Sequence, residues 1–320
     1  MKTELETTET VARKTQGKRL LERIVEQRYL LLMLLPTLVV IFIFVYKPVL
    51  GWWLAFSDHR IGFGIYDGPW VGMKYFKQFF GTAGNALFVF RNTLVINLVS
   101  LIVNMTAAII FAVLISEIPT KWFRRTVQTM SLFPFFISWV ITYVIFQSFF
   151  AVQTGMVNVV LTKLGIVENG INLLGGAEFS LVLMASANLW KSLGYNAVIF
   201  LAAIAGIDQA QYEAAEIDGA SRLQRIRHIT LPGLLGTVTV LLIINSGWIL
   251  RSNFGQFKLF TNATNRQTME VFATYIYRYG LEKGRYSYAT AVSIFSSIIS
   301  LILLTVVNTA SKRLNERALF

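Results

Sequence analysis

Apolar residues are concentrated in six long segments of the chain, and shorter polar stretches connect these segments. The segments run at about 29–57, 86–116, 127–152, 180–206, 234–255 and 286–309. Each segment is long enough to cross a bilayer as a helix, which takes about 20 predominantly apolar residues. The pattern therefore predicts an all-α fold: a polytopic membrane bundle with six transmembrane helices.

The stretch before the first segment is polar and basic. Residues 1–16 contain Thr, Glu and Lys without an apolar period and are expected to be disordered. Residues 17–27 place apolar side chains at helical spacing beside basic ones, which suits a helix on the anionic cytoplasmic leaflet or, equally, a solvated tail. The first apolar segment is too long for a signal-peptide core and lacks a small-residue cleavage site, so we expect no cleavable signal.

Composition agrees with a membrane protein and excludes several functions. The chain is 55% hydrophobic and 14% charged, whereas a soluble domain has about 25% charged residues. Its net charge of +12 does not indicate a nucleic-acid partner, because the basic residues cluster at the ends of the apolar segments. Without cysteine, and with His59 and His228 as the two histidines, we expect no metal site, and no acid–base or nucleophile set of an enzyme is evident.

Lysine and arginine predict the orientation of the chain in the membrane. The N-terminal tail, the 117–126 and 207–232 connections and the C-terminus together carry 16 of them, and the alternate connections carry 9. Connections rich in Lys and Arg stay on the cytoplasmic side. Both termini and the 207–232 connection are therefore predicted to be cytoplasmic.

The 207–232 connection has the pattern of a polar helical hairpin. Asp208 and Gln211 have capping-box spacing, so a helix can start just after Asp208. Gly219 supplies the backbone freedom for a turn. A second short helix is expected from Ser221 to His228, followed by a new helix with Pro232 in its first turn.

Within this hairpin stands a pattern with many fixed positions: Glu213-Ala214-Ala215, three residues, Gly219, nine residues, Ile229, one residue, then Leu231-Pro232. The small alanines leave a shallow face that another surface can approach closely, and Glu213 can pair with an arginine of that surface. A plain connecting hairpin is the alternative. The candidate docking residues are Glu213, Ala214, Ala215, Asp218, Gly219, Arg222, Leu231 and Pro232.

The segment resembles the EAA loop of permease subunits in binding-protein-dependent ABC importers. "RYLLLMLLPTLVVIFIFVYKPVLGWWLAF" and "YSYATAVSIFSSIISLILLTVVN" are also similar to carbohydrate-uptake permeases, most of all those for complex or uronate-containing oligosaccharides of the alginate or aldouronate type. The resemblance covers about residues 28–312. It implies an importer transmembrane domain at 29–312, with cytoplasmic tails at 1–28 and 313–320.

The resemblance also implies the partners of the chain. Such a subunit forms a heterodimer with a second permease in the inner membrane, and each EAA loop docks in a groove of one of two cytoplasmic ATPase subunits. A periplasmic binding protein delivers the oligosaccharide. The chain has no G-x-x-x-x-G-K-[ST] loop, so ATP and Mg belong to the ATPase subunits and the chain itself needs no cofactor.

Polar and aromatic side chains within the fourth and fifth segments are candidates for the substrate path. Aromatic faces and amide groups suit a saccharide, and Lys191 and Arg251 would favour an anionic sugar. Alternatively, the two cations reach for the membrane edge and the amides bond between helices. The candidates are Asn188, Trp190, Lys191, Tyr195, Asn196, Asn245, Trp248, Arg251, Asn253 and Phe254.

A polar stripe in the second segment contains Arg91, Asn92, Asn97 and Asn104, and it is expected to pack against the partner permease or to line the pore rim. The main alternative function is a secondary transporter for a small solute. Such a transporter would need acidic residues within the membrane and paired repeats. The six segments are nearly free of Asp and Glu, and no repeat is visible, which disfavours this alternative.

Overall fold

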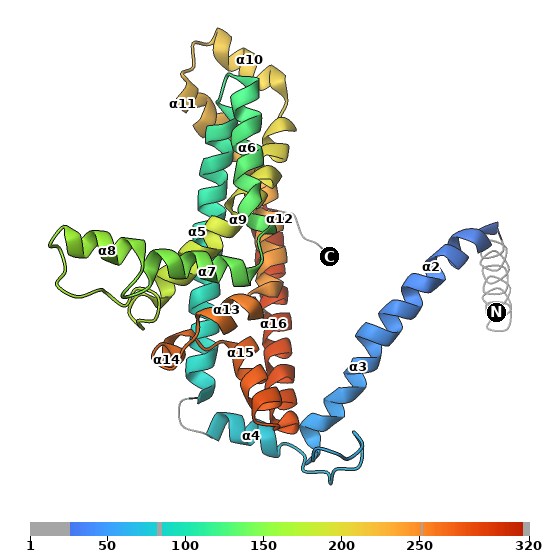
Figure 1. The fold of residues 1–320 in the computed structure, drawn as a ribbon. Helices are drawn as coiled ribbons and strands as arrows, with labels where there is room; N and C mark the ends of the chain where they lie inside the picture. The colour runs from blue at the N-terminus through green and yellow to red at the C-terminus, as the bar shows by residue number, and fades with distance from the viewer. Residues whose placement is uncertain (1–25, 82–84, 251, 316–320) are drawn as a thin grey trace, which may run out of the picture.

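The computed structural model describes residues 26–81, 85–250 and 252–315. This part of the chain is helical and has no strand, apart from an isolated bridge between Ser57 and Trp70. The helices form an elongated bundle, with α10 and α11 at one end and α4 at the other (Figure 1). The all-α class predicted from the apolar segments is confirmed.

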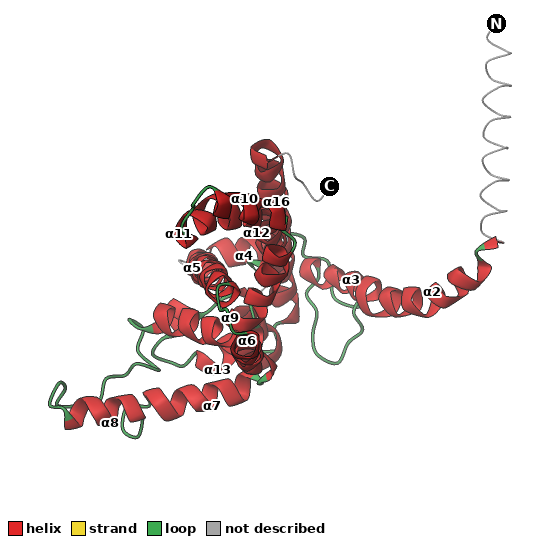
Figure 2. Cartoon of the chain, turned by 90° about the horizontal axis from the view of Figure 1, so that it is seen from above, coloured by secondary structure: helices red, strands yellow, loops and turns green. Residues whose placement is uncertain are grey.

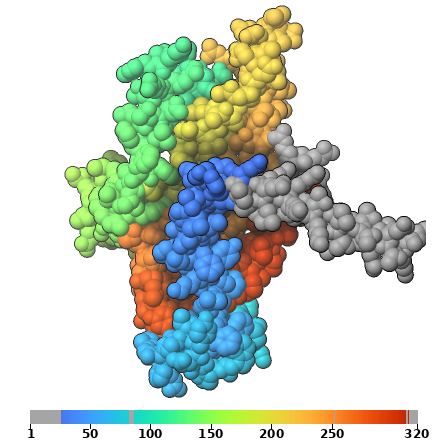
Figure 3. Space-filling view, turned by 90° about the vertical axis from the view of Figure 1, so that its right-hand side faces the viewer, coloured from blue at the N-terminus to red at the C-terminus, as the bar shows by residue number. Residues whose placement is uncertain are grey.

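The first predicted span is one helical rod that stands away from the bundle. It consists of α2 (Arg28–Ile41), the π-helical η1 (Phe42–Tyr46), α3 (Lys47–Val49) and the 3₁₀-helical η2 (Leu50–Phe56). No residue of α2, η1 or α3 is buried. Figure 2 shows the rod extending away from the other helices, and Figure 3 shows it as a separate ridge in front of them. The apolar side chains of α2 therefore have no partner within the described chain.

Four long helices form the centre of the bundle: α5 (Asn85–Ser116), α9 (Ser180–Ala205), α12 (Leu231–Trp248) and α16 (Tyr286–Asn315). Small side chains let α5 and α9 approach each other closely, since Ala108 and Ala112 are fully buried beside Ala197. Phe200 and Leu234 complete this core. Small residues at helix crossings are the usual means of packing in a membrane, where apolar burial between helices contributes little.

The third predicted segment consists of two helices that meet at a sharp bend. α6 begins at Lys121 and ends at Phe136, and α7 (Trp139–Phe150) leaves it at 102°. Pro134 lies in the last turn of α6, Ile137 and Ser138 are extended, and the Ser138 hydroxyl accepts a hydrogen bond from Ile141 N as the N-cap of α7. Beyond α7, α8 (Met156–Lys163) projects sideways from the bundle (Figures 1 and 2). The apolar segment predicted at 127–152 therefore contains a sharp bend, which the apolar pattern did not predict.

The end of the bundle that carries α4 is built from short helices around an aromatic core. They are α4 (Lys74–Gly81), α13 (Phe254–Phe260), α14 (Arg266–Met269), α15 (Phe272–Tyr277) and the π-helical η4 (Arg278–Glu282). Phe79, Tyr275 and Tyr288 are almost fully buried there, and the two tyrosine hydroxyls are 2.7 Å apart. The Glu270 carboxylate, which is buried, accepts two hydrogen bonds of 2.6 and 2.7 Å from the Arg278 guanidinium.

Four helical runs in the described part are long and apolar enough to cross a bilayer. The number is six if each of the two bent pairs, α6 with α7 and α9 with α10 (Gln209–Ile217), is one span. The predicted membrane bundle is thus confirmed, with one span sharply bent. Residues 1–25, where an interfacial helix was one expectation, lie outside the described residues.

Candidate functional site

A polar helical hairpin closes the end of the bundle between α9 and α12. α10 follows α9 after a break with a bend of 70°. Asp208 is its N-cap and accepts a hydrogen bond of 3.0 Å from Ala210 N. Gly219 has a φ of +73°, a conformation that glycine adopts without strain. After the turn, Ser221 and Gln224 form a capping box at the start of α11 (Arg222–Arg225).

α10 begins directly after Asp208, as expected, but two details of the hairpin differ from the expectation. Asp208 bonds to the amide two residues ahead, so the capping box is at Ser221 and not at Asp208. Pro232 does not begin a new helix, because α11 continues through the π-helical η3 (Ile226–Thr230) into α12 without a break. A π-turn before the proline accommodates its missing amide donor. The hairpin therefore consists of α10, the turn at Gly219, and α11 with η3, which continue into α12 as one helix.

Two side-chain contacts join the two arms of the hairpin. The Tyr212 hydroxyl lies 2.9 Å from Thr230 Oγ1, which joins α10 to the base of α12. Arg225 forms an ion pair of 3.4 Å with Glu216. The hairpin thus connects α9, which precedes α10, to α12, which follows η3.

The docking candidates lie together on this hairpin. Glu213, Ala214 and Ala215 belong to α10, Asp218 and Gly219 form the turn, Arg222 begins α11, and Leu231 and Pro232 begin α12. Sequence reasoning missed two apolar side chains that the hairpin presents to the outside, Ile217 at 87% exposure and Leu223 at 74%. Their signal is visible in retrospect: each is a large apolar residue within a polar connection.

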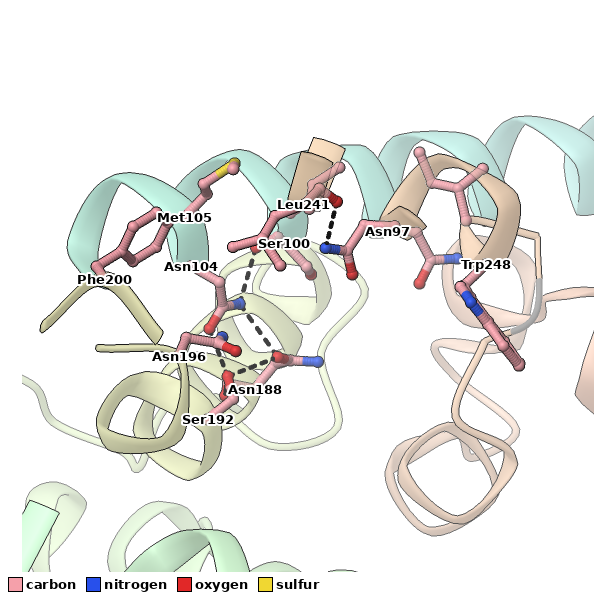
Figure 4. A pocket seen from close by; sticks show the side chains of 13 residues that line it. Asn97, Ser100, Asn104, Met105, Asn188, Ser192, Asn196, Phe200, Leu241 and Trp248 are labelled. Atoms are coloured by element: carbon pink, nitrogen blue, oxygen red, sulfur yellow. Dashed lines mark hydrogen bonds between the residues drawn. The ribbon is translucent and has the colours of Figure 1, made fainter. Parts of the chain in front are cut away.

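A cavity of about 220 Å³ lies between α5, α9 and α12 (Figure 4). Amide and hydroxyl side chains line its middle, and none of the described lining residues carries a charge. The lining residues are Asn97, Ser100, Leu101, Asn104, Met105, Asn188, Ser192, Asn196, Phe200, Leu241, Asn245, Trp248 and Ile249.

A hydrogen-bond network fixes the amides of this cavity. Asn104 Nδ2 donates to Asn188 Oδ1 at 3.1 Å, and Ser192 Oγ donates to Asn104 Oδ1 at 2.6 Å. Asn188 Nδ2 lies 3.4 Å from Gln256 Oε1, and Gln256 Nε2 donates to the Met184 carbonyl oxygen at 3.1 Å. The network thus joins α5, α9 and α13 around the cavity.

The two ends of the cavity differ in chemistry. Met105 and Phe200 lie together at one end and Trp248 at the other (Figure 4). Phe200 is nearer than Asn188 to the end of α9 that leads into the hairpin, so the apolar end faces the hairpin. Between the ends, Asn245 bonds within its own helix, to the Leu241 carbonyl oxygen at 2.7 Å. Its remaining hydrogen-bonding capacity is available to a ligand.

The substrate-path candidates divide into three groups. Asn188, Asn196, Asn245 and Trp248 line the cavity. Five others do not line the cavity. Three of them pack their rings against other rings: Trp190 edge-on against Phe146, Tyr195 on Phe135, and Phe254 against Tyr277. Asn253 caps α13, and Lys191 binds the end of α6. Arg251 lies outside the described residues.

Lys191 does not line this cavity and lies against the end of α6 instead. Its ammonium donates to the carbonyl oxygens of Pro134 at 3.2 Å and Phe135 at 2.9 Å, and also to that of Ile137. It lies 5.5 Å from the centre of the Trp139 ring. The Pro134 carbonyl oxygen also accepts a hydrogen bond of 3.2 Å from Ile137 N, whereas those of Phe135 and Ile137 lie beyond the last intrahelical bond. The three carbonyl oxygens accept the hydrogen bonds that the ammonium donates.

The polar stripe of α5 serves two purposes. Asn97 and Asn104 line the cavity, as the expectation of a pore-rim position allowed. Asn92 is buried and donates to the carbonyl oxygens of Gln267 at 2.9 Å and Glu270 at 3.3 Å, so its role is to hold α14. Ser100 and Ser192 were missed. Ser192 could have been found, because Asn188, Ser192 and Asn196 are spaced by four and share one helical face.

Comparison with known proteins identifies the family. The family model "Binding-protein-dependent transport system inner membrane component" matches residues 104–319. Protein LplB of Bacillus subtilis is 38% identical over 92% of this chain and 91% of its own length. The polygalacturonan/rhamnogalacturonan transport system permease protein YteP of Bacillus subtilis is 36% identical over 97% of this chain and 96% of its own.

Solved structures lead to the same family. A chain of a bacterial ABC transporter involved in the import of the acidic polysaccharide alginate superimposes with a TM-score of 0.85, at 36% identity, over 93% of this chain and 99% of that one. A second structure of an alginate ABC transporter, in complex with an alginate pentasaccharide-bound periplasmic protein, gives a TM-score of 0.84 at 34% identity. The predicted transport subunit, rather than an enzyme, is confirmed. The chain belongs to the multi-pass inner-membrane components of binding-protein-dependent transport systems.

Proposed function

We propose that this chain is one permease of an ATP-driven importer, and that it passes an acidic oligosaccharide from a periplasmic binding protein towards the cytoplasm. The observation that carries the proposal is the position of the asparagine-lined cavity. It lies between the two helices, α9 and α12, that the hairpin joins. A movement of the hairpin is therefore a movement of two walls of the cavity.

The chemistry of the cavity suits a sugar. Five asparagine side chains line it, and each carboxamide offers two donors and one acceptor. Sugar hydroxyls need both kinds of partner, whereas an apolar solute needs neither. The Trp248 ring at the end away from the hairpin provides a flat face for the C–H surface of a sugar ring.

A second permease completes the path. The cavity of about 220 Å³ is smaller than the ~300–1,000 Å³ of typical ligand pockets, so this chain alone does not enclose an oligosaccharide. The helical rod Arg28–Phe56 is 29 residues long, and no residue of its α2, η1 and α3 parts is buried. The apolar side chains of these three parts are available to the partner permease. We assign this rod to the contact between the two permeases.

The hairpin is the docking element for an ATPase subunit. Its exposed apolar residues, Ile217 and Leu223, flank the turn, and Glu213 and Arg222 supply charges beside them. An apolar centre with a polar rim is the usual composition of a specific protein interface. ATP and Mg are bound and used by that ATPase, and this chain contributes the mechanical link.

The orientation follows from the distribution of basic residues. The connections on the hairpin side of the membrane, together with the two termini, contain 16 Lys and Arg, against 9 in the opposite connections. By the positive-inside rule, both termini and the hairpin are cytoplasmic. The Trp248 end of the cavity then faces the periplasm, from which the sugar arrives.

The preference for an acidic sugar rests on the relatives. Those at 36–38% identity include permeases named for polygalacturonan or alginate, and relatives named for arabinooligosaccharides or for trehalose and maltose are 27–29% identical. Amide N–H groups donate to carboxylates as well as to hydroxyls, so an uncharged cavity is compatible with a uronate. Secondary transport coupled to an ion is disfavoured, because α5, α9, α12 and α16 contain no Asp or Glu.

Uptake by the reconstituted complex tests the proposal. The two permeases and the ATPase subunits are placed in liposomes containing ATP, the binding protein is added outside, and entry of labelled oligouronate is measured. We expect Asn245→Ala to raise KM about tenfold, the equivalent of one or two hydrogen bonds. Thr305→Ala is the matched control, because Thr305 is exposed, bonds within its own helix at 2.8 Å and lies outside the cavity. Uptake that is independent of ATP contradicts the proposed function.

A further inference from the structure

We propose that Lys191 is a positioning residue: it sets the angle between α6 and α7 and thereby holds these helices against α9, a wall of the cavity, and it does not bind the transported anion. The inference rests on the proposed function and names a further part of the same machine. Four observations support it: the carbonyls bound by the ammonium, the lack of an acidic partner, the locked contact between α6 and α9, and the contacts that lead from the bend back to the cavity.

The ammonium of Lys191 occupies the open end of α6. An α-helix leaves its last carbonyl groups without partners, and the aligned peptide dipoles concentrate negative charge there. Lys191 donates to three acceptors at this end, the carbonyl oxygens of Pro134, Phe135 and Ile137. A charged cap supplied by a second helix thus stabilises a helix end that would otherwise leave acceptors unpaired in an apolar environment.

No described carboxylate neutralises this charge. The ion pairs among the described residues do not include Lys191, and its other contact is the face of the Trp139 ring. An ionised side chain within the membrane is costly and is typical of a functional position. An ammonium has three donors, and three carbonyls accept them. Lys191 therefore has no free donor for a sugar carboxylate.

α6 and α9 pack closely against each other next to this helix end. A Cβ atom at Gly194 would lie 2.0 Å from the Ser131 carbonyl oxygen, so the two backbones are in direct contact. One residue further, the Tyr195 ring stacks on Phe135, with centres 4.1 Å apart and planes at 6°. Lys191, Gly194 and Tyr195 share one face of α9. α6 consequently moves with α9.

Beyond the bend between α6 and α7, contacts of α7 and α13 lead from α6 back to the cavity. Tyr143 and Phe146 of α7 contact the Phe260 ring of α13 at 5.1 and 5.8 Å between ring centres. Gln256 of α13 reaches Asn188 in the cavity wall. The helices α9, α6, α7 and α13 therefore form a closed series of contacts. Lys191 fixes the one sharp angle in that series.

Spin labels on the two arms of the bend measure this angle directly. The chain has no cysteine, so Met130→Cys on α6 and Phe149→Cys on α7 give a unique labelled pair, and both positions are exposed. In the assembled importer we expect a narrow distance distribution. Lys191→Met should broaden it, and Lys191→Arg, which keeps a cation with several donors, should preserve it. No broadening with Met, or equal broadening with Met and Arg, overturns the proposal. Lys191→Gln replaces Met if that variant does not fold.

A functional measurement separates positioning from anion binding. Lys191→Met should lower the ratio of substrate-stimulated to basal ATP hydrolysis about tenfold, the equivalent of one charge-assisted hydrogen bond, and Lys191→Arg should restore it. Competition by acidic and by neutral oligosaccharides should change by the same factor. A selective loss of acidic competitors in the Met variant overturns the positioning role. Failure of the unmodified complex to transport would refute the proposed function instead, because the spin-label distances are read without transport.

Discussion

Ile217→Ala is the sharpest test of the docking role of the hairpin. Ile217 is 87% exposed at the end of α10, so its truncation removes almost no contact within this chain. Alanine also favours the helix. The substitution removes three carbon atoms, each worth ~0.8 kcal/mol when it is buried. Burial of the exposed part in an ATPase groove therefore contributes about 2 kcal/mol, or roughly 30-fold in Kd.

The assay is the binding of purified ATPase subunits to the two permeases in nanodiscs without nucleotide, followed by biolayer interferometry. Leu235→Ala is the matched control, since it also removes three carbons, from a residue of α12 that is 58% exposed but does not belong to the hairpin. We expect weaker binding for Ile217→Ala alone. An unchanged Kd, or the same loss in both variants, would refute the reasoning.

Three further predictions concern the hairpin, the helix crossing and the α4 end of the bundle. Glu213→Lys should abolish substrate-stimulated ATP hydrolysis while the chain still inserts, and normal uptake in this variant would contradict docking through α10. Gly194→Val should lower the free energy of unfolding by about 1–3 kcal/mol through overpacking, seen as a lower Tm, whereas Gly51→Ala, with no atom within 4 Å of the added carbon, should leave Tm unchanged. The hydrogen bond from Tyr75 lowers the pKa of Asp58, so its stabilisation is present at neutral pH and lost as pH falls through that lowered pKa. Tyr75→Phe should therefore lower Tm at neutral pH, and its difference from the unmodified chain should shrink as pH falls through the pKa of Asp58. A Tm difference that does not depend on pH would contradict this.

The apolar segments and the EAA pattern are local properties of the sequence, and they predicted the helices and the hairpin well. Segment length alone decides whether a helix can span a membrane. The bend after α6 is different. Pro134 permits a break but does not require one. At this break the Lys191 ammonium binds the carbonyl oxygens of the helix end, including that of Ile137. Lys191 lies 54 residues from Ile137 along the chain, and no local sequence pattern predicts such a contact.

The cavity was predictable in part. The candidate set combined two neighbouring faces of α9: Asn188 and Asn196 point into the cavity, while Lys191 and Tyr195 point to α6. Lys191 lies three residues after Asn188 and thus on an adjoining part of the helix surface, so helical periodicity alone does not remove it from the substrate path. Its charge suggested an anion site, and the carbonyls that take up this charge belong to a helix end that the sequence did not predict.

The most direct test of the account is a structure of the assembled importer with an oligouronate bound. We predict density for the sugar between α5, α9 and α12, within hydrogen-bond distance of Asn188 or Asn245 and beside Trp248, with Lys191 still bound to the carbonyls of α6. Sugar density outside this cavity, or a uronate carboxylate bound to Lys191, would contradict the account.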